Sequence, residues 1–306
     1  EIVPNSNVLN TLSGLADGAD FFITNLEGPI LSHEDRSKKI NKSGPNIYGD
    51  AKVTIGVLKA LNINVVALAN NHIFDYGSFG LTETLKTLEL EGIQHSGAGI
   101  NIDDAKAPVI LVKNDISVCF ISVCEHEWGI AVRQCGGSFL FDVSEISRYV
   151  NNLSELYDHI IVSYHGGLEY SEAPSPLMIN NLRLIADSGA SFIFCHHTHR
   201  VNGHENWNGT PIFYGLGNFL FAKANSDDAW RKGLLVSASF TKDKVKLDSI
   251  NTLKFNPNYT DVTIDKNESN SFLCPDMPLS EEYHSLWLKE IESAIGILDI
   301  YSNAYR

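Results

Sequence analysis

The chain has 306 residues, of which 43% are hydrophobic and 20% are charged, proportions that are ordinary for a globular protein. Its 37 acidic residues outnumber its 23 basic residues and give a formal net charge of −14 at pH 7, which argues against a nucleic-acid-binding surface. No apolar stretch reaches the length of about 18 residues that a membrane-spanning helix needs, so no membrane segment is visible in the sequence.

The sequence leaves the cellular compartment open. The chain starts at Glu1 and shows no signal peptide. We expect a protein that is soluble as given, either cytoplasmic or an extracytoplasmic domain trimmed of its anchor. The five cysteines are an odd number without CxxC spacing, which argues against a disulfide framework.

Taken along the chain, the pattern alternates short strands with helices, which is typical of α/β proteins. Helices are expected over residues 8–16, 53–61, 79–91, 144–157, 176–188 and 279–298, with Ser144 as an N-cap and with Gly92 and Gly189 closing two of them. Strands are expected over residues 21–23, 65–69, 160–164 and 192–195, with a hairpin over 109–123, antiparallel strands after Pro211 and a surface loop over 256–276. We therefore expect one domain over residues 1–255 and a C-terminal loop and helix, residues 256–306, that pack on it.

Four of the predicted strands end at residues that bind metals or transfer protons. These endings are Asn25-Leu26-Glu27, Asn70-Asn71-His72, His165 and His196-His197-Thr198-His199. Continuous apolar strands are covered on both faces, and ligands of such sheets bind beyond the carboxyl ends of the strands. We therefore expect the four endings to meet at one edge and to form a metal centre.

The histidine cluster is the strongest of these signals. His197 and His199 can reach one ion if the chain turns after the strand, and neutral imidazole suits Zn, Fe, Mn and Ni. His196 would then face elsewhere and line the substrate pocket. Three histidines in four residues are rare by chance, although a purely structural origin stays open.

The other endings each have a structural alternative. Asn71 could be a neutral metal ligand and His72 a general acid, or both could belong to a capped turn. His165, before two glycines, could bind an ion or end a turn. Glu27 could bridge two ions or be a solvated carboxylate beside the turn that follows it.

Several residues form a second group of candidates. Asp75 and Glu169 could each orient a histidine, the first His72 and the second His165, and we count both with His72 as catalytic; either could instead cap a helix. Asn218 lies where a strand meets glycines and could line a pocket or occupy a bulge. The residues assigned to substrate binding are Asn25, Asn70, His196 and Asn218.

Taken together, five segments resemble the CapA proteins, which are associated with poly-γ-glutamate capsule synthesis. The segments are NLEGPI at 25–30, NNHIFDYG at 70–77, HGGLEY at 165–170, HHTH at 196–199 and LGNFLF at 216–221. This family is similar to the calcineurin-like metallophosphoesterases. The resemblance implies a four-layer α/β/β/α sandwich with a dinuclear metal site, in which Glu27 bridges, Asn71, His165, His197 and His199 bind metal, and His72 assists the leaving group.

The sequence departs from the family at three points. The family opens with a strand that ends in Gly-Asp, whose Asp binds metal, and no such motif precedes Asn25. Either that strand lies upstream of Glu1 or one ligand is missing. Cys195 stands where the family has Gly, and Thr198 where it has Pro; neither change removes a ligand.

Two functions remain as hypotheses. The first is a metal-dependent hydrolase of a phosphoester, or of an amide such as polyglutamate, in which two divalent transition metal ions (Mn, Fe or Zn) bind an anionic substrate, small or polymeric, and activate a bridging water. The second is a non-catalytic subunit that binds the polymer or assembles with capsule synthesis proteins on the same fold. No nucleotide P-loop is present, which argues against an ATP-dependent ligase.

Overall fold

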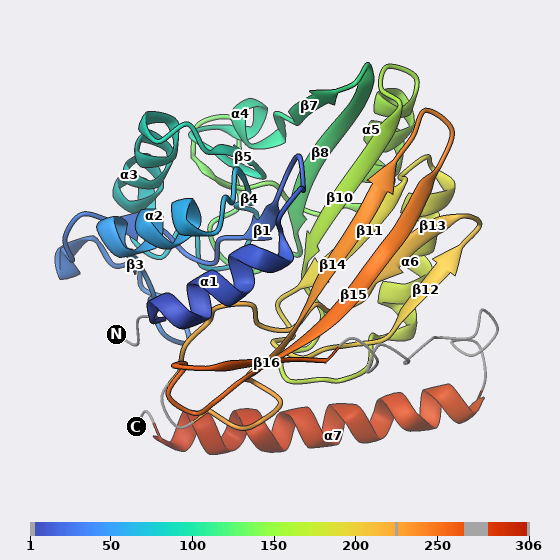
Figure 1. Ribbon diagram of the computed structural model, residues 1–306. Coiled ribbons are helices and arrows are strands. Elements are labelled where there is room, and N and C mark those ends of the chain that lie inside the picture. The colour runs from blue at the N-terminus through green and yellow to red at the C-terminus, as the bar shows by residue number, and fades with distance from the viewer. Residues whose placement is uncertain (1–3, 224–225, 266–280, 305–306) are drawn as a thin grey trace. The chain divides into compact units, whose positions relative to one another are not determined.

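The computed structural model describes residues 4–223, 226–265 and 281–304. By its internal contacts the chain divides into two compact units. Among the described residues, the N-terminal unit comprises residues 4–142 and 163–165, and the C-terminal unit comprises residues 143–162, 166–223, 226–265 and 281–304. Both units combine strands with helices (Figure 1), so the α/β class is confirmed, and each supplies a sheet and helices, as the predicted sandwich requires.

The N-terminal unit is built around a three-stranded parallel sheet in the order β1-β4-β5. Its strands and principal helices are β1 (Ile23–Asn25), β4 (Val65–Ala67), β5 (Gln94–Ser96), α1 (Ser6–Leu15), α2 (Ala51–Ala60) and α3 (Gly77–Leu90). The central strand β4 is fully buried together with Leu68 and Ala69, which follow it. Because apolar residues surround β4 on both faces, the polar residues that come next are fixed to a rigid support.

A hairpin and several short elements complete this unit. In the hairpin, β7 (Val109–Lys113) pairs with β8 (Ile116–Cys124), and the two turn residues Asn114 and Asp115 have φ of 50° and 61°, which confirms the predicted hairpin. The short elements are β2 (Ile30–Leu31), the 3-10 helix η1 (Arg36–Lys38), β3 (Gly49–Asp50), β6 (Ala98–Gly99), α4 (Ile102–Lys106) and β9 (Gly137–Ser138).

The C-terminal unit contains strands in the order β12-β13-β11-β10. Its first elements are α5 (Val143–Ser154), β10 (His159–His165, of which residues 159–162 belong to this unit), α6 (Pro176–Asp187), β11 (Phe192–His196), β12 (His204–Trp207) and β13 (Thr210–Phe213). A second, antiparallel sheet joins β14 (Lys232–Phe240), β15 (Val245–Phe255) and β16 (Val262–Asp265), and α7 (Glu281–Ala304) follows. The ring of Phe240 in β14 lies 6.5 Å from that of Phe192 in β11, so the two sheets are in contact.

Most predicted elements are present, with corrections to a helix start, a strand end and a loop. Helix α5 begins at Val143, so Ser144 lies within its first turn and the prediction of Ser144 as N-cap is wrong. The apolar run after Pro211 does not continue as a strand. It ends at Phe213 because Gly215 and Gly217 turn the chain, and Gly217 has a φ of +65° and lies against the backbone of Lys232.

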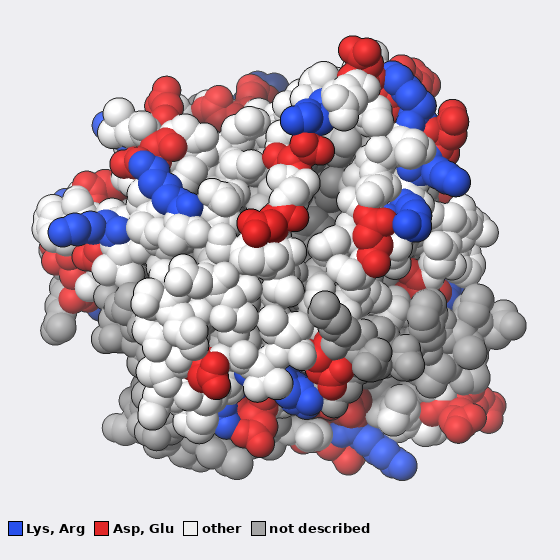
Figure 2. All heavy atoms as spheres, viewed as in Figure 1, with Lys and Arg blue, Asp and Glu red and all other residues white. Residues whose placement is uncertain are grey.

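The C-terminal part of the chain is described only in part. The predicted helix over 279–298 is present as α7 from Glu281 onward, and residue 279 lies outside the described residues. The prediction of a surface loop over 256–276 is wrong in its described part, because residues 262–265 form β16 and pair with β15; residues 266–276 lie outside the described residues. The predicted boundary at residue 255 stays a prediction. In the described part of the chain, no helix has the length and apolar character needed to cross a membrane. On the face shown in Figure 2, Lys and Arg side chains are interspersed with Asp and Glu.

Candidate metal centre

Asn70 ties the loop after β1 to the loop after β4. Its side chain is fully buried, and its Oδ1 accepts from the backbone N–H groups of Gly28 and His72, both at 3.2 Å. Its Nδ2 donates to the carbonyls of Leu26 at 2.9 Å and Leu68 at 3.2 Å. The Asn70 amide therefore positions its neighbours, and its role in substrate binding stays a prediction.

Asn71 and His165 meet at the ends of β4 and β10. The His165 Nε2 lies 3.1 Å from the Asn71 Oδ1, although the two residues are far apart in the sequence. This distance is that of a hydrogen bond. Two ligands that each bind one ion at about 2.1 Å are separated by about 3.0–3.4 Å, so the two atoms are also close enough to share a metal ion. The Asn71 Nδ2 donates to the Glu127 Oε2 at 2.8 Å, which directs the amide oxygen toward His165.

His72 is oriented by Asp75, the residue three positions later. The His72 Nδ1 lies 2.7 Å from the Asp75 Oδ2, which also accepts from the backbone N–H of Ile47 at 2.7 Å. The carboxylate of Asp75 is fully buried and forms an ion pair with Lys42. A histidine held through Nδ1 presents Nε2 as its reactive nitrogen.

The N-terminal unit also gathers carboxylates around the end of β8. The side chain of Asn25 donates to the Glu27 Oε2 at 3.3 Å, and both residues are partly buried. Burial raises the pKa of the Cys124 thiol well above its usual value, and the charges of Glu127, Glu125 and Glu27 raise it further. These three glutamates therefore lie close enough to act on one buried atom, and Glu27 is placed among other acids.

The C-terminal unit holds His197 and His199 in a strained turn. Both have positive φ, 92° and 54°, a conformation that is uncommon for residues with a side chain and that concentrates at functional sites. Tyr170, with a φ of 65°, is bound to this turn because its backbone N–H donates to the Thr198 carbonyl at 2.7 Å. The chain therefore turns after β11, as the proposed i, i+2 ligand pair requires.

His199 is fixed by two neighbours. Its Nδ1 lies 2.9 Å from the Asn218 Oδ1, and its ring stacks on Trp230 with a centroid separation of 4.4 Å. The Asn218 Nδ2 donates in turn to the Trp230 carbonyl at 3.0 Å. Asn218 thus orients a predicted metal ligand, and its role in substrate binding stays a prediction.

His196 and Glu169 have an aromatic and a cationic neighbour, respectively. The His196 ring packs edge-on against Phe194 with a centroid separation of 5.6 Å, and burial of the ring lowers its pKa to about 4, although the residue as a whole is only half-buried. Burial lowers the pKa of Lys223, whereas the charges of Glu169 and Asp227 act on that pKa in the opposite direction. Glu169 therefore has a cationic neighbour, and the catalytic and substrate roles predicted for these residues stay predictions.

Within the described residues, no three His, Cys, Asp or Glu side chains are grouped so that they could hold a metal ion. The N-terminal unit brings Asn71 together with His165 and His72 together with Asp75. The C-terminal unit brings His199 together with Asn218. The donor pair of an amide oxygen and an imidazole nitrogen fits a transition metal ion.

Sequence reasoning missed the contribution of Glu127, Glu125 and Lys42. The first two were open to prediction, because the apolar run of β8 also stops at a polar cluster, Glu125-His126-Glu127, as the other four strands do. Lys42 had no such signal, because it lies in an irregular loop thirty residues before His72.

Comparison with known proteins identifies a protein family that this chain matches. The family described as bacterial capsule synthesis protein PGA_cap matches residues 3–223. The capsule biosynthesis protein CapA of Bacillus anthracis is 30% identical over 232 residues, which are 74% of this chain and 55% of that protein. The PGA biosynthesis protein CapA of Bacillus subtilis (strain 168) is 30% identical over 220 residues, 70% of this chain and 55% of that protein.

The chain thus spans just over half the length of these two relatives. Among solved structures, a hypothetical protein from Thermus thermophilus has a TM-score of 0.51 at 16% identity, and the match covers 83% of this chain and 96% of that one. This likeness concerns the fold alone.

Proposed function

The chain belongs to the family of bacterial capsule synthesis proteins, PGA_cap, and we propose that it is a metal-dependent hydrolase linked to capsule or poly-γ-glutamate metabolism. The substrate class that we propose is an anionic phosphoester, or the amide bond of a polyglutamate chain. One observation carries the proposal: Asn71 Oδ1 and His165 Nε2 lie 3.1 Å apart, beside a histidine oriented by a buried carboxylate. The printed names of the relatives support the capsule context.

In each unit we assign the residues that would hold a divalent metal ion. They are Glu27, Asn71 and His165 in the N-terminal unit and His197 and His199 in the C-terminal unit. Imidazole, amide and carboxylate donors suit Mn, Fe or Zn. When bound, such ions would neutralise the anionic substrate and lower the pKa of an attacking water.

His72 is the residue that we assign to proton transfer. Because its Nδ1 is held by Asp75, its Nε2 is the nitrogen that would face the substrate. In its doubly protonated form, with Nδ1–H bound to Asp75, it would donate the Nε2 proton to the leaving oxygen or nitrogen, or stabilise the charge that develops there. Asp75 acts through His72 and is a positioning residue.

The test is hydrolysis of an aryl phosphodiester and of poly-γ-glutamate by the purified chain after incubation with Mn, Zn or Fe. We expect turnover of at least one of these substrates, and its loss in His197→Ala. The matched control is His284→Ala, which removes an exposed histidine of α7 and should leave the rate unchanged. Full activity of the His197→Ala variant would overturn the proposal.

A second candidate is a non-catalytic subunit that binds the polymer. One observation favours it, namely that no group of three His, Cys, Asp or Glu ligands is present among the described residues. Binding of labelled poly-γ-glutamate without metal and without shortening of the polymer would support this candidate. It would also oppose the hydrolase.

A further inference from the structure

We propose that Lys42 is a positioning residue of the catalytic site, which fixes Asp75 and, through it, the orientation and tautomer of His72. This inference rests on the function proposed above for His72. It concerns a residue outside the five segments that resemble the CapA proteins, and it deepens the account of the same site.

The burial of Lys42 is the first observation. Its side chain is only 2% exposed, although lysine is among the residue types that are almost never buried unless they are paired. Its ammonium forms an ion pair with the Oδ1 of Asp75, whose side chain is 0% exposed. Burying two charges is costly, and breaking such a pair leaves an uncompensated charge.

The second observation is how the loop carrying Lys42 is attached. The backbone N–H of Ile40 and the side chain of Asn46 both donate to the Asp75 carbonyl, at 3.0 and 2.9 Å. The backbone N–H of Ile47 donates to the Asp75 Oδ2 at 2.7 Å. The loop from residue 40 to residue 47 is therefore bound to Asp75 on both sides of Lys42, and this places the ammonium reproducibly.

The third observation is the distance from Lys42 to the catalytic ring. The Lys42 Nζ lies 3.1 Å from the His72 Nδ1, which lies 2.7 Å from the Asp75 Oδ2. A ring nitrogen that carries hydrogen donates to the carboxylate, and one without hydrogen accepts from the ammonium. The Nδ1–H tautomer satisfies both groups, because Nδ1–H donates to Oδ2 while the ammonium pairs with Oδ1, and the shorter distance to Oδ2 favours this tautomer.

Through these contacts Lys42 fixes the orientation of the Asp75 carboxylate, which an exposed surface ion pair would not do. With Lys42 on Oδ1, the Asp75 carboxylate is held with Oδ2 directed at His72. Without it, Oδ1 loses its ion pair, the carboxylate is held through Oδ2 by the Ile47 N–H, and the acceptor of Nδ1–H is less firmly fixed. His72 would then present a mixture of tautomers, and only the Nδ1–H form leaves Nε2 free to take up the proton that it later donates.

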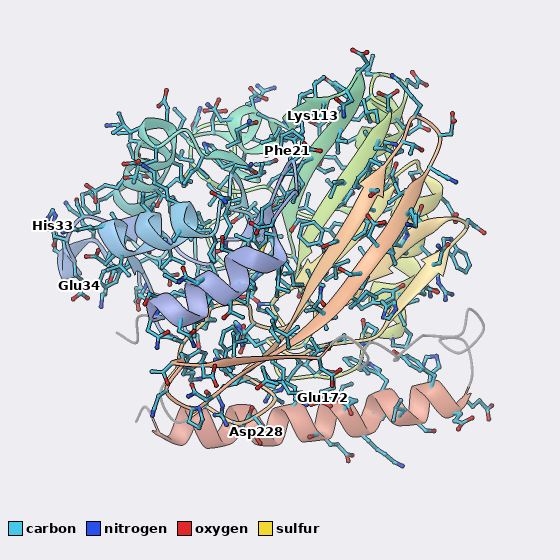
Figure 3. All side chains as sticks on the ribbon, viewed as in Figure 1. Phe21, His33, Glu34, Lys113, Glu172 and Asp228 are labelled. Carbon is cyan, nitrogen blue, oxygen red and sulfur yellow. The ribbon has the colours of Figure 1, made fainter. Side chains whose placement is uncertain are left out.

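The chain contains a matched control in Lys39, three residues earlier in the same region. Lys39 lies at the surface, where it pairs with Glu34 at 2.8 Å, and its ammonium lies over the Tyr76 ring at 5.7 Å. Glu34 is labelled in Figure 3, where it lies in the loop that precedes η1. Lys39→Met thus removes a cation from this region without touching Asp75 or His72.

The experiment compares the wild-type chain with Lys42→Met, Lys42→Gln and Lys39→Met by nitrogen NMR of labelled histidines. The His72 signals are assigned from their loss in His72→Gln. We expect Nδ1–H in the wild-type chain and in Lys39→Met, and an altered tautomer ratio in both Lys42 variants. In protein incubated with Mn, we expect kcat on an aryl phosphodiester to fall about tenfold or more, part of the ~10²–10⁴-fold that a positioned acid or base contributes, with KM unchanged.

Unchanged His72 nitrogen shifts in a folded Lys42 variant would overturn the inference. Circular dichroism establishes folding, and Lys42→Gln, which keeps a polar group near Asp75, serves if Lys42→Met does not fold. The NMR readout needs neither metal nor substrate. A chain that binds no metal and shows no turnover would therefore refute the proposed function, while the tautomer result would still decide the role of Lys42.

Discussion

The hydrogen bond between Asn71 and Glu127 predicts a measurable effect on metal affinity. We expect Glu127→Ala to weaken Mn²⁺ binding by about 10–100-fold, because residues that orient a metal ligand typically contribute that much. Titration calorimetry measures it. Glu125→Ala is the control, since Glu125 accepts from the Tyr164 hydroxyl at 2.9 Å instead of from Asn71. Equal losses in the two variants would show that charge, and not the orientation of Asn71, governs the affinity.

The cysteines give a second prediction at single positions. Burial raises the pKa of Cys119 to about 12 and those of Cys124 and Cys195 well above the usual value, so these groups stay neutral thiols at pH 8. Cys135 is exposed. The thiolate is the reactive form of cysteine. Iodoacetamide at pH 8 should therefore label Cys135 in the folded chain and spare Cys119, Cys124 and Cys195, as peptide mass spectrometry would show. Rapid labelling of Cys195 would contradict its burial.

Some side-chain contacts of the candidate site could be predicted from the sequence, and others could not. The contact expected between His72 and Asp75 is present, because a spacing of three brings both to one side of a turn. Lys42 could not be predicted, because its position depends on three hydrogen bonds between an irregular loop and Asp75. Asn70 was assigned to substrate, although its amide binds only backbone groups.

Among the elements, α6 is attached to β12 by a buried ion pair. Arg183 of α6 donates to both carboxylate oxygens of Glu205, at 2.9 and 2.7 Å, and the Tyr214 hydroxyl donates to the same carboxylate. The Arg183 and Glu205 side chains are 7% and 1% exposed. Removing one partner would leave a buried charge uncompensated.

We therefore expect Glu205→Ala to lower the free energy of unfolding by about 3–5 kcal/mol in urea denaturation. The control is Asp248→Ala, which breaks the exposed pair with Lys246 and should cost no more than about 1 kcal/mol. Similar losses in the two variants would contradict the structural role assigned to Arg183 and Glu205.

Helices and strands could be predicted where the hydrophobic periodicity coincided with residues that form a turn or end a helix. The hairpin of β7 and β8 and the end of α3 at Gly92, with a φ of +68°, follow from local turn chemistry. Of the antiparallel strands expected after Pro211, β14 and β15 are present. The first apolar run ends as a strand at Phe213, because an apolar run does not show that Gly217 must lie against the backbone of Lys232. The start of α5 was misplaced by one residue, which is within the usual disagreement on helix boundaries.

At the scale of the whole molecule, metal binding should raise the thermal stability of the folded chain. An ion that binds only the folded chain raises stability by about 2.7 kcal/mol at a concentration a hundred times its Kd. We expect the thermal midpoint to rise with added Mn²⁺ and to return with a chelator. The increase should be smaller in His165→Ala. A midpoint that is insensitive to Mn, Zn and Fe would favour the polymer-binding subunit.

The predicted ligands come from segments far apart in the chain, and the sequence indicates them only through their position after strands. Residues that follow strands meet at one edge of a sheet only if the strands are parallel. The strands β1, β4 and β5 of the N-terminal unit are parallel. The family adds capsule synthesis as context, and the chain covers 55% of its two CapA relatives. Substrate choice is therefore best tested on the chain itself and on its full-length relatives in parallel.

The most direct test is elemental analysis of the chain purified without chelators and incubated with Mn, Zn or Fe, together with the rate of aryl phosphodiester hydrolysis in the same preparation. We expect about two equivalents of transition metal per chain. Turnover should rise in proportion to the metal content, and both should be lost in His197→Ala. A preparation without bound metal and without turnover would contradict the proposal that this chain is a metal-dependent hydrolase.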